Sequence, residues 1–304
     1  MIRFQTFIAE ATLRQGISHV NDLKHEHLGT LLGVGTKHEG HVQGYASEKT
    51  DAMAFEVGHD QHGFYTRTSH SDKMRQPGDY GKAAKAKFGP THNPTISAHF
   101  DAMHHSFHKN KELRSYLENH ARHHGGESSI RGEMFHLPQA AHKDPKSGHV
   151  TFVGTAYDPK HMGKEGMFVA HAGMNQKHNV HHLTTLGDRN IKIHHDIPET
   201  GHKVSVDASA EAEKYKEINP KILKSRKQAD APEKARHKKM LDSVKSSLDK
   251  KLRAHMSTIK PKWGNETEGH VLHPSQHNPS APRIKVVDPR FKQRKQERGR
   301  DYTK

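Results

Sequence analysis

Apolar residues recur along this chain of 304 residues at two different periods, which predict two kinds of element. Short runs with strand-like alternation or β-branched content predict strands, because side chains two apart share one face of a sheet. Such runs occupy residues 53–57, 63–67, 130–135, 150–153, 166–171, 191–193 and 283–288. Steps of three and four predict a helix over residues 94–124, ending at Gly125-Gly126.

From about residue 207 the composition changes to Lys, Ala, Glu and Ser with almost no aromatic residues. Within this region Leu241, Val244, Leu248, Leu252 and His255 recur at steps of three and four, which predicts an amphipathic helix. Residues 221–255 hold twelve Lys or Arg and four Asp or Glu, so this helix is basic. It either lies along a phosphate backbone or presents a solvated face.

The composition shows that the chain is strongly basic. Lys and Arg total 49 against 34 Asp and Glu, a formal net charge of +15 that favours polyanionic partners, nucleic acid first. The chain has no cysteine, so disulfides and thiolate metal sites are excluded. No run approaches the roughly 18 apolar residues of a membrane span, so no membrane partner is expected.

Histidine is unusually frequent, with 32 residues, several of them in pairs at helical spacing. His104 with His108, and His120 with His124, lie four apart, and neutral imidazoles bind zinc or copper. A histidine-based metal protein is therefore one reading of this composition, and exposed polar side chains that become cationic in acid are the other.

The first eleven residues place Phe4, Phe7 and Ile8 on one helical stripe and are too polar for a secretory signal. Ile8-Ala9-Glu10 followed by Ala11 resembles the capsid-targeting leader of internal head proteins in tailed bacteriophages, which a prohead protease removes. The resemblance implies a virion head location, contact with that protease and the capsid interior, and delivery to the host cytoplasm.

Five stretches in a fixed order carry the candidate chemistry: Lys37-His38-Glu39-Gly40 after a strand-like run, Thr66-Arg67, Glu133 on a predicted strand, Val150-Thr151-Phe152-Val153, and Glu268-Gly269-His270-Val271 followed by Lys285. A lysine at a sheet edge can attack phosphorus if its environment lowers its pKa. This order resembles the covalent nucleotidyltransferases, which are ATP-dependent DNA and RNA ligases and capping enzymes, and above all the ligase-like proteins of tailed phages.

The resemblance assigns roles to four residues of the first two stretches. Lys37 would be the nucleophile that forms a lysyl-AMP adduct and releases pyrophosphate. Glu39 would take the acidic position of the K-x-D/E-G motif, and Gly40 would let the backbone approach the nucleotide. Arg67 would contact a phosphate.

The later stretches complete the implied site. Glu133 would bind the ribose hydroxyls, Phe152 would stack on adenine, Glu268 would hold Mg²⁺, and Lys285 would neutralise the α-phosphate. Three departures qualify the match: position 39 is Glu, His270 interrupts the apolar run, and the last motif has a single lysine. Glu165-Gly166 is a rival for the glutamate-glycine motif.

The implied fold is α+β, an antiparallel-sheet nucleotidyltransferase core (ATP-grasp-like ligase) with a basic helical insert and a disordered basic tail. Its expected parts are a cleavable leader at 1–10, core at 11–204, the insert at 205–260, core completion at 261–292 and the tail at 293–304. The implied activity, using ATP and Mg²⁺, seals RNA or DNA ends. The alternative is a non-enzymatic, basic internal head protein that binds packaged DNA.

Overall fold

The structure is a computed structural model, and its described residues fall into two compact units. They are residues 17–49, 53–68, 71–88, 94–136, 140–143, 150–153, 158–199, 201–228, 231–264 and 267–291, with Gln293 and Glu297. Unit 1 comprises Met1–Lys49, Pro198–Lys262 and Thr267–Asp288, and unit 2 comprises Thr50–Ile197, Trp263–Glu266 and Pro289–Lys304. Both units are therefore assembled from separated stretches of the chain.

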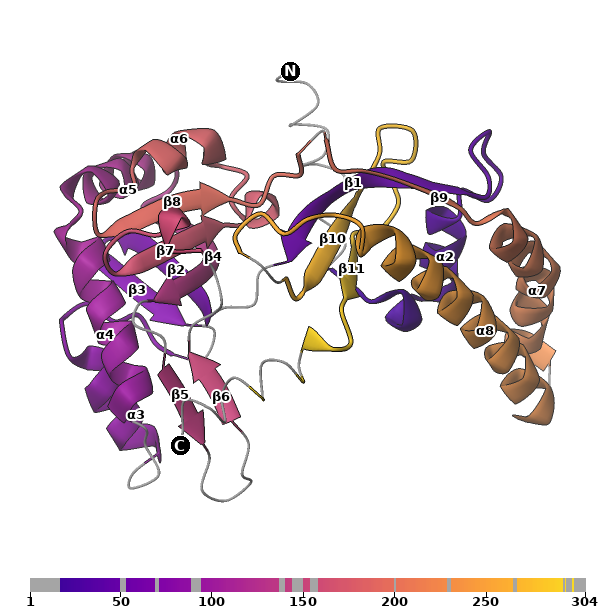
Figure 1. Cartoon of the computed structure of the whole chain (residues 1–304), viewed down its shortest axis with the longest axis horizontal. Coiled ribbons are helices and arrows are strands. Elements are labelled where there is room, and N and C mark those ends of the chain that lie inside the picture. The colour runs from indigo at the N-terminus through magenta and orange to yellow at the C-terminus, as the bar shows by residue number, and fades with distance from the viewer. Residues whose placement is uncertain are drawn as a thin grey trace. The chain divides into compact units, whose positions relative to one another are not determined.

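Unit 1 is a four-stranded antiparallel sheet with helices on one face (Figure 1). The strand order is β11-β10-β1-β9, so β1 lies inside the sheet. The elements are η1 (Val20–Asp22), α2 (His25–Leu31), β1 (His41–Lys49), β9 (Lys203–Asp207), α7 (Ser209–Gln228), α8 (Ala231–Met256), β10 (Gly269–Pro274) and β11 (Ile284–Val287).

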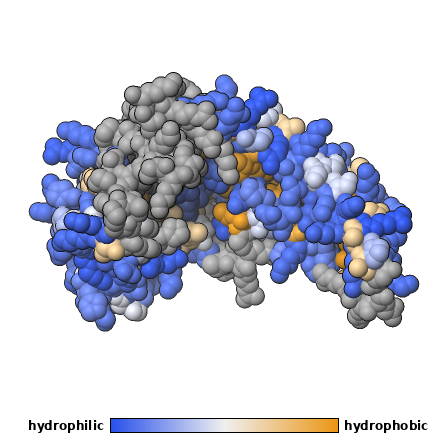
Figure 2. Space-filling model, turned by 90° about the horizontal axis from the view of Figure 1, so that it is seen from below, coloured by the Kyte–Doolittle hydropathy of each residue, from blue (hydrophilic) through white to orange (hydrophobic). Residues whose placement is uncertain are grey.

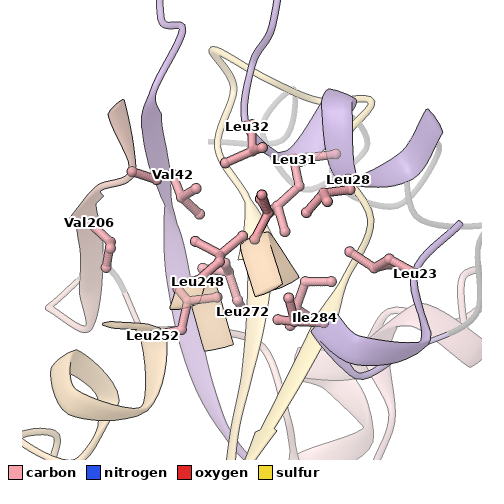
Figure 3. Close-up of a cluster of buried hydrophobic side chains, with 14 of the residues drawn as sticks. Leu23, Leu28, Leu31, Leu32, Val42, Val206, Leu248, Leu252, Leu272 and Ile284 are labelled. Carbon is pink, nitrogen blue, oxygen red and sulfur yellow. The ribbon is translucent and has the colours of Figure 1, made fainter. Parts of the chain in front are cut away.

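One apolar core joins these helices to one face of the unit 1 sheet. Val42, Val206, Leu272 and Ile284 contribute from the strands, and α2 and α8 contribute leucines (Figure 3). Leu248 and Leu252 of α8 are fully buried there. Because alternate strand residues face opposite sides, the neighbours of these core residues point to the other face of the sheet.

Unit 2 is a five-stranded sheet, order β3-β2-β4-β7-β8, accompanied by a two-stranded sheet of β5 and β6. The β7–β8 pair is parallel and the other pairs are antiparallel. The elements are β2 (Met53–Asp60), β3 (Gly63–Thr68), α3 (Asp79–Phe88), α4 (Pro94–Lys109), α5 (Lys111–His123), β4 (Ser128–His136), β5 (Ala140–Lys143), β6 (Val150–Val153), η3 (Pro159–His161), β7 (Gly166–Ala170), η4 (Ala172–Met174), α6 (Val180–Thr185) and β8 (Ile191–His195).

The core of unit 2 repeats the arrangement of unit 1, since helical residues cover one face of the sheet. Phe55, Val57, Ile130 and Phe168 pack from the strands against side chains of α3 to α6. The face opposite this core carries the alternate residues of the same strands. A smaller apolar cluster contains Phe135, Met162, Met167, Val169 and Trp263.

The α+β class and most predicted strands are confirmed, including those at 130–135, 150–153, 166–171 and 284–287. The single helix predicted over 94–124 is two helices, because Asn110 ends α4 and caps α5 by accepting from Leu113 N–H at 2.9 Å. The region expected as a helical insert holds α7 and α8, and both helices contribute to the core of unit 1.

The prediction that a strand precedes Lys37 is wrong. Residues 32–40 form turns after α2. Gly33, Gly35 and Gly40 have φ values of 65°, 80° and 77°, which lie in the left-handed region that a strand does not use. The proposed leader lies outside the described residues, as does most of the proposed tail.

Candidate functional site

Lys37 is an exposed residue of the turn that leads into β1. Its neighbour Glu39 accepts a hydrogen bond from Gly35 N–H at 2.9 Å and pairs with Lys216 of α7 at 2.6 Å. The hydrogen bond from Gly35 and then the Lys216 ammonium hold the pKa of Glu39 below its ordinary value. The first contact stabilises the turn, and the second connects the turn to α7.

Gly40 is fixed by the path of the backbone. Its carbonyl accepts from Ala208 N–H at 2.7 Å, and a Cβ added to it would lie 2.8 Å from Ser209 Cα. Only glycine adopts φ +77° without strain and leaves room for this contact. The backbone conformation and the contact with Ser209 therefore explain why glycine occupies position 40. The role of Gly40 toward a nucleotide stays a prediction.

Glu268 lies directly before β10 and forms an ion pair with Lys49, the last residue of β1. The two side chains are 14% and 23% exposed, so the pair is largely withdrawn from solvent. The antiparallel register places Lys49 opposite Gly269. Gly269 has φ +150°, and a Cβ there would lie 2.1 Å from the Val286 carbonyl oxygen, so the glycine lets β11 approach.

Lys285 belongs to the same face of the unit 1 sheet as Lys49. It pairs with Val271, and Val271 pairs with Ser47, two residues before Lys49. Paired residues point to the same side of a sheet, and residues two apart do so as well. Ser47 Oγ lies 2.8 Å from His273 Nε2, and both side chains are buried on this face. We call Ser47, Lys49, Glu268, His273 and Lys285 the β1 carboxyl-end cluster.

The structure does not bring Lys37 to this cluster. Lys37 precedes the first residue of β1, whereas Lys49 is the last, and an extended strand of this length spans about 26 Å. Of the predicted residues in unit 1, Glu268 contacts Lys49, and Lys285 lies on the same face two strands away, while Lys37, Glu39 and Gly40 lie at the other end of β1.

Lys49 is a candidate that sequence reasoning missed. The signal was present, since Lys49-Thr50-Asp51-Ala52 has the lysine and the acidic residue at the spacing of the K-x-D/E-G motif. Alanine stands where that motif has glycine, which hides the match. Residues 50–52 lie outside the described residues, so the assignment depends on Lys49 and its contacts.

In unit 2, Arg67 and Glu133 lie on the sheet face opposite the helices. Arg67 pairs with Glu56 at 2.9 Å, and Arg131, two residues before Glu133, pairs with the same carboxylate at 2.8 Å. Burial alone would raise the pKa of Glu56, but the two guanidiniums hold it below its ordinary value. Glu56 thus orders two arginines next to Glu133.

Glu133 also has a histidine neighbour that the sequence did not reveal. His171 Nε2 lies 3.8 Å from Glu133 Oε1, and His171 Nδ1 lies 2.9 Å from Asp196 Oδ2. Asp196 also accepts from Ala172 N–H at 2.6 Å. The imidazole therefore lies between two carboxylates, and its contact with Asp196 orients it toward Glu133.

Phe152 is on β6, and its side chain lies outside the described residues, so its stacking role stays a prediction. Glu165, the rival for the glutamate-glycine motif, precedes β7 in unit 2.

The histidines form clusters in the structure, since the His120 ring stacks on the rings of His124 and His178 with centroids 4.1 Å apart in each case. Among the described residues, no three His, Asp or Glu side chains are arranged to hold a metal ion.

Comparison with protein-family models, with curated proteins and with solved structures found no match to this chain. In the part of the chain that the structure describes, no helix combines the length and the apolar composition that crossing a membrane requires. The interpretation of the site therefore depends on its own geometry.

Proposed function

We propose that this chain is an ATP-dependent, ligase-like nucleotidyltransferase whose covalent acceptor is Lys49, in place of the Lys37 that its motif order suggested. The observation that carries the proposal is the β1 carboxyl-end cluster. It joins a lysine followed by Thr50-Asp51, the glutamate of Glu268-Gly269 and the lysine of the last motif. These are three of the elements that the family resemblance requires, and they come from separated parts of the sequence.

The chemistry of the cluster suits phosphoryl transfer to an amine. Lys49 Nζ would attack the α-phosphorus of ATP, forming an N–P bond while the P–O bond to pyrophosphate breaks. An ammonium has no lone pair, so Lys49 must first lose a proton to solvent. Binding of Mg²⁺ by Glu268 would take the carboxylate away from the amine and leave Lys49 free to attack. Lys285 adds positive charge on the same face, where negative charge develops on the phosphate.

The donor chemistry at this end of β1 also fits magnesium. Carboxylate oxygens are the ligands that Mg²⁺ prefers, and Glu268 supplies them. When bound, Mg²⁺ would offset phosphate charge during transfer. The roles that the resemblance implies for Glu133, Arg67 and Phe152, which all belong to unit 2, stay predictions. The nucleotide would pass from Lys49 to the 5′-phosphate of an RNA or DNA end.

Self-labelling separates the two lysines. The purified protein is incubated with α-labelled ATP and Mg²⁺, beside Lys49→Arg, Lys49→Ala and, as the matched control, Lys37→Ala. Label should stay with the denatured wild-type chain and with Lys37→Ala, and should fall to background in both Lys49 variants. Arginine keeps the charge but is not a nucleophile, so Lys49→Arg separates chemistry from charge.

Two results would contradict the proposal. Label that survives in Lys49→Arg and disappears in Lys37→Ala would return the site to the Lys37 turn. No label in any variant, under varied nucleotides and metals, would favour the non-enzymatic DNA-binding head protein, which the net charge of +15 also fits.

A further inference from the structure

We infer that the outward face of α8 is a nucleic-acid-binding surface that contacts the phosphate backbone. This inference goes beyond nucleotidyl transfer and stands without it. The surface is the α8 stripe, defined as Arg236, Lys239, Ser243, Ser246 and Lys250.

The α8 stripe follows from the spacing of its residues. They are separated by steps of three and four, so they lie along one side of the helix. All five are exposed, while Leu241, Val244, Leu248 and Leu252 are buried in the unit 1 core on the other side. At 1.5 Å per residue the stripe is about 21 Å long.

The charge of the stripe is available for a partner. Two other cations of α8 are neutralised: Lys251 pairs with Glu211 at 2.7 Å, and Arg253 pairs with Asp249 at 2.6 Å. Arg236, Lys239 and Lys250 form no ion pair with any described residue, and the stripe contains no acidic residue. Unpaired cations at this density attract a polyanion.

The chemistry of the stripe favours nucleic acid among polyanions. A guanidinium, two ammonium groups and two serine hydroxyls all donate hydrogen bonds, and donors of these kinds contact phosphate oxygens without reading bases. Phosphates of one strand follow at about 3.4 Å along the axis, so a stripe of about 21 Å spans about six of them. Figure 2 shows one face of the molecule, on which most side chains outside the grey atoms are hydrophilic and an apolar patch lies near the centre.

The stripe and the β1 carboxyl-end cluster lie on opposite sides of the unit 1 sheet. The buried side of α8 packs on the core face, whereas Lys49 and Lys285 belong to the other face. A strand bound along α8 therefore lies away from Lys49. The stripe would retain the protein on a nucleic acid, and the two activities should be separable by mutation.

The test measures binding of a labelled single-stranded DNA of about 20 nucleotides by fluorescence anisotropy, with RNA and duplex DNA of the same sequence in parallel. The variant is Arg236→Gln with Lys239→Gln and Lys250→Gln, because glutamine keeps helix propensity. The matched control removes three exposed lysines of unit 2: Lys82→Gln, Lys85→Gln and Lys111→Gln. Circular dichroism verifies folding of both.

The stripe variant should bind the DNA at least about tenfold more weakly near 0.1 M salt. The slope of its log K against log salt concentration should be smaller in magnitude than that of the wild type by about two. The control should change by less than about threefold. Equal weakening in both, or no binding by the wild type, would overturn the inference. Self-labelling with ATP is followed on the same preparations. Absence of label from the wild type, with DNA binding lost only in the stripe variant, would count against the Lys49 chemistry and leave the inference about α8 standing.

Discussion

The two ends of β1 each carry a lysine followed two residues later by an acidic residue, yet their surroundings differ. At the amino end, Glu39 is engaged by Gly35 and Lys216, and Lys37 is exposed. At the carboxyl end, Lys49 pairs with Glu268, a residue more than two hundred positions away. The difference lies in the groups that the fold brings to each lysine from elsewhere in the chain, which is why we propose Lys49 as the acceptor.

The largest effect should come from removing the distant carboxylate. Glu268→Gln keeps the size of the side chain but removes its charge, so self-labelling should fall by about a hundredfold or more. Glu39→Gln is the matched control, since it removes the acidic group at the other end of β1, and its labelling should stay within about twofold of wild type. If both variants lose label equally, the two ends of β1 are not functionally different.

Glycine substitutions test the structural role of the amino end. Gly40→Ala should lower the free energy of unfolding by about 3 kcal/mol, because φ +77° is strained and the new Cβ meets Ser209. Gly35→Ala has a similar φ of +80° and nothing within 4 Å, so it should cost about 1 kcal/mol. Urea unfolding followed by circular dichroism measures both, and equal losses would show that Ser209 does not confine Gly40.

Acid should weaken unit 1 through His270, a buried residue of β10 that pairs with Glu48 near the carboxyl end of β1. Burial, and then the charge of His202, lowers the pKa of His270 to about 4 from an ordinary 6.5. The unfolded chain therefore binds more protons between these values, and stability is lost as pH falls from about 6.5 toward 4. The loss between pH 7 and pH 5 should be about 2 kcal/mol.

The variant His270→Gln should flatten this pH dependence, and His41→Gln, at the exposed amino end of β1, should leave it unchanged. Urea unfolding at a series of pH values provides the comparison. An unchanged slope in His270→Gln would mean that other groups cause the acid sensitivity.

The smallest effect should come from Lys216→Gln. The Lys216–Glu39 pair is at the surface, where an ion pair is screened by solvent, and Glu39 keeps its hydrogen bond from Gly35. Thermal unfolding should therefore be unchanged within error, as should self-labelling. A clear loss of either would mean that the amino-end turn does more than connect α2 to β1.

The sequence predicted the fold where one local signal was strong. The strands at 130–135 and 166–171 and the helix over 241–255 have clear periodicity, and Gly125-Gly126 correctly ended a helix. The turn at 32–40 was misread because its β-branched residues resemble a strand, while three glycines with positive φ decide its path. The local sequence pattern could not decide between a strand, which the β-branched residues favour, and a turn, which the glycines favour.

The site was predictable only in part, for a similar reason. Motif order suggested Glu268 and Lys285, whose roles stay predictions, and the choice between Lys37 and Lys49 depends on register, which pairs Lys49 with Gly269. His171 and Asp196 were not found, because a histidine among 32 carries no local signal of its contact with Glu133. Non-local contacts of this kind require the folded chain.

The most direct test of the central claim is to locate the nucleotide on the wild-type protein. After incubation with ATP and Mg²⁺, the chain is digested at a pH that preserves the N–P bond, and the peptides are sequenced by mass spectrometry. The account predicts the AMP adduct on Lys49, with the peptide that contains Lys37 unmodified. An adduct on Lys37, or on any lysine outside the β1 carboxyl-end cluster, would contradict it.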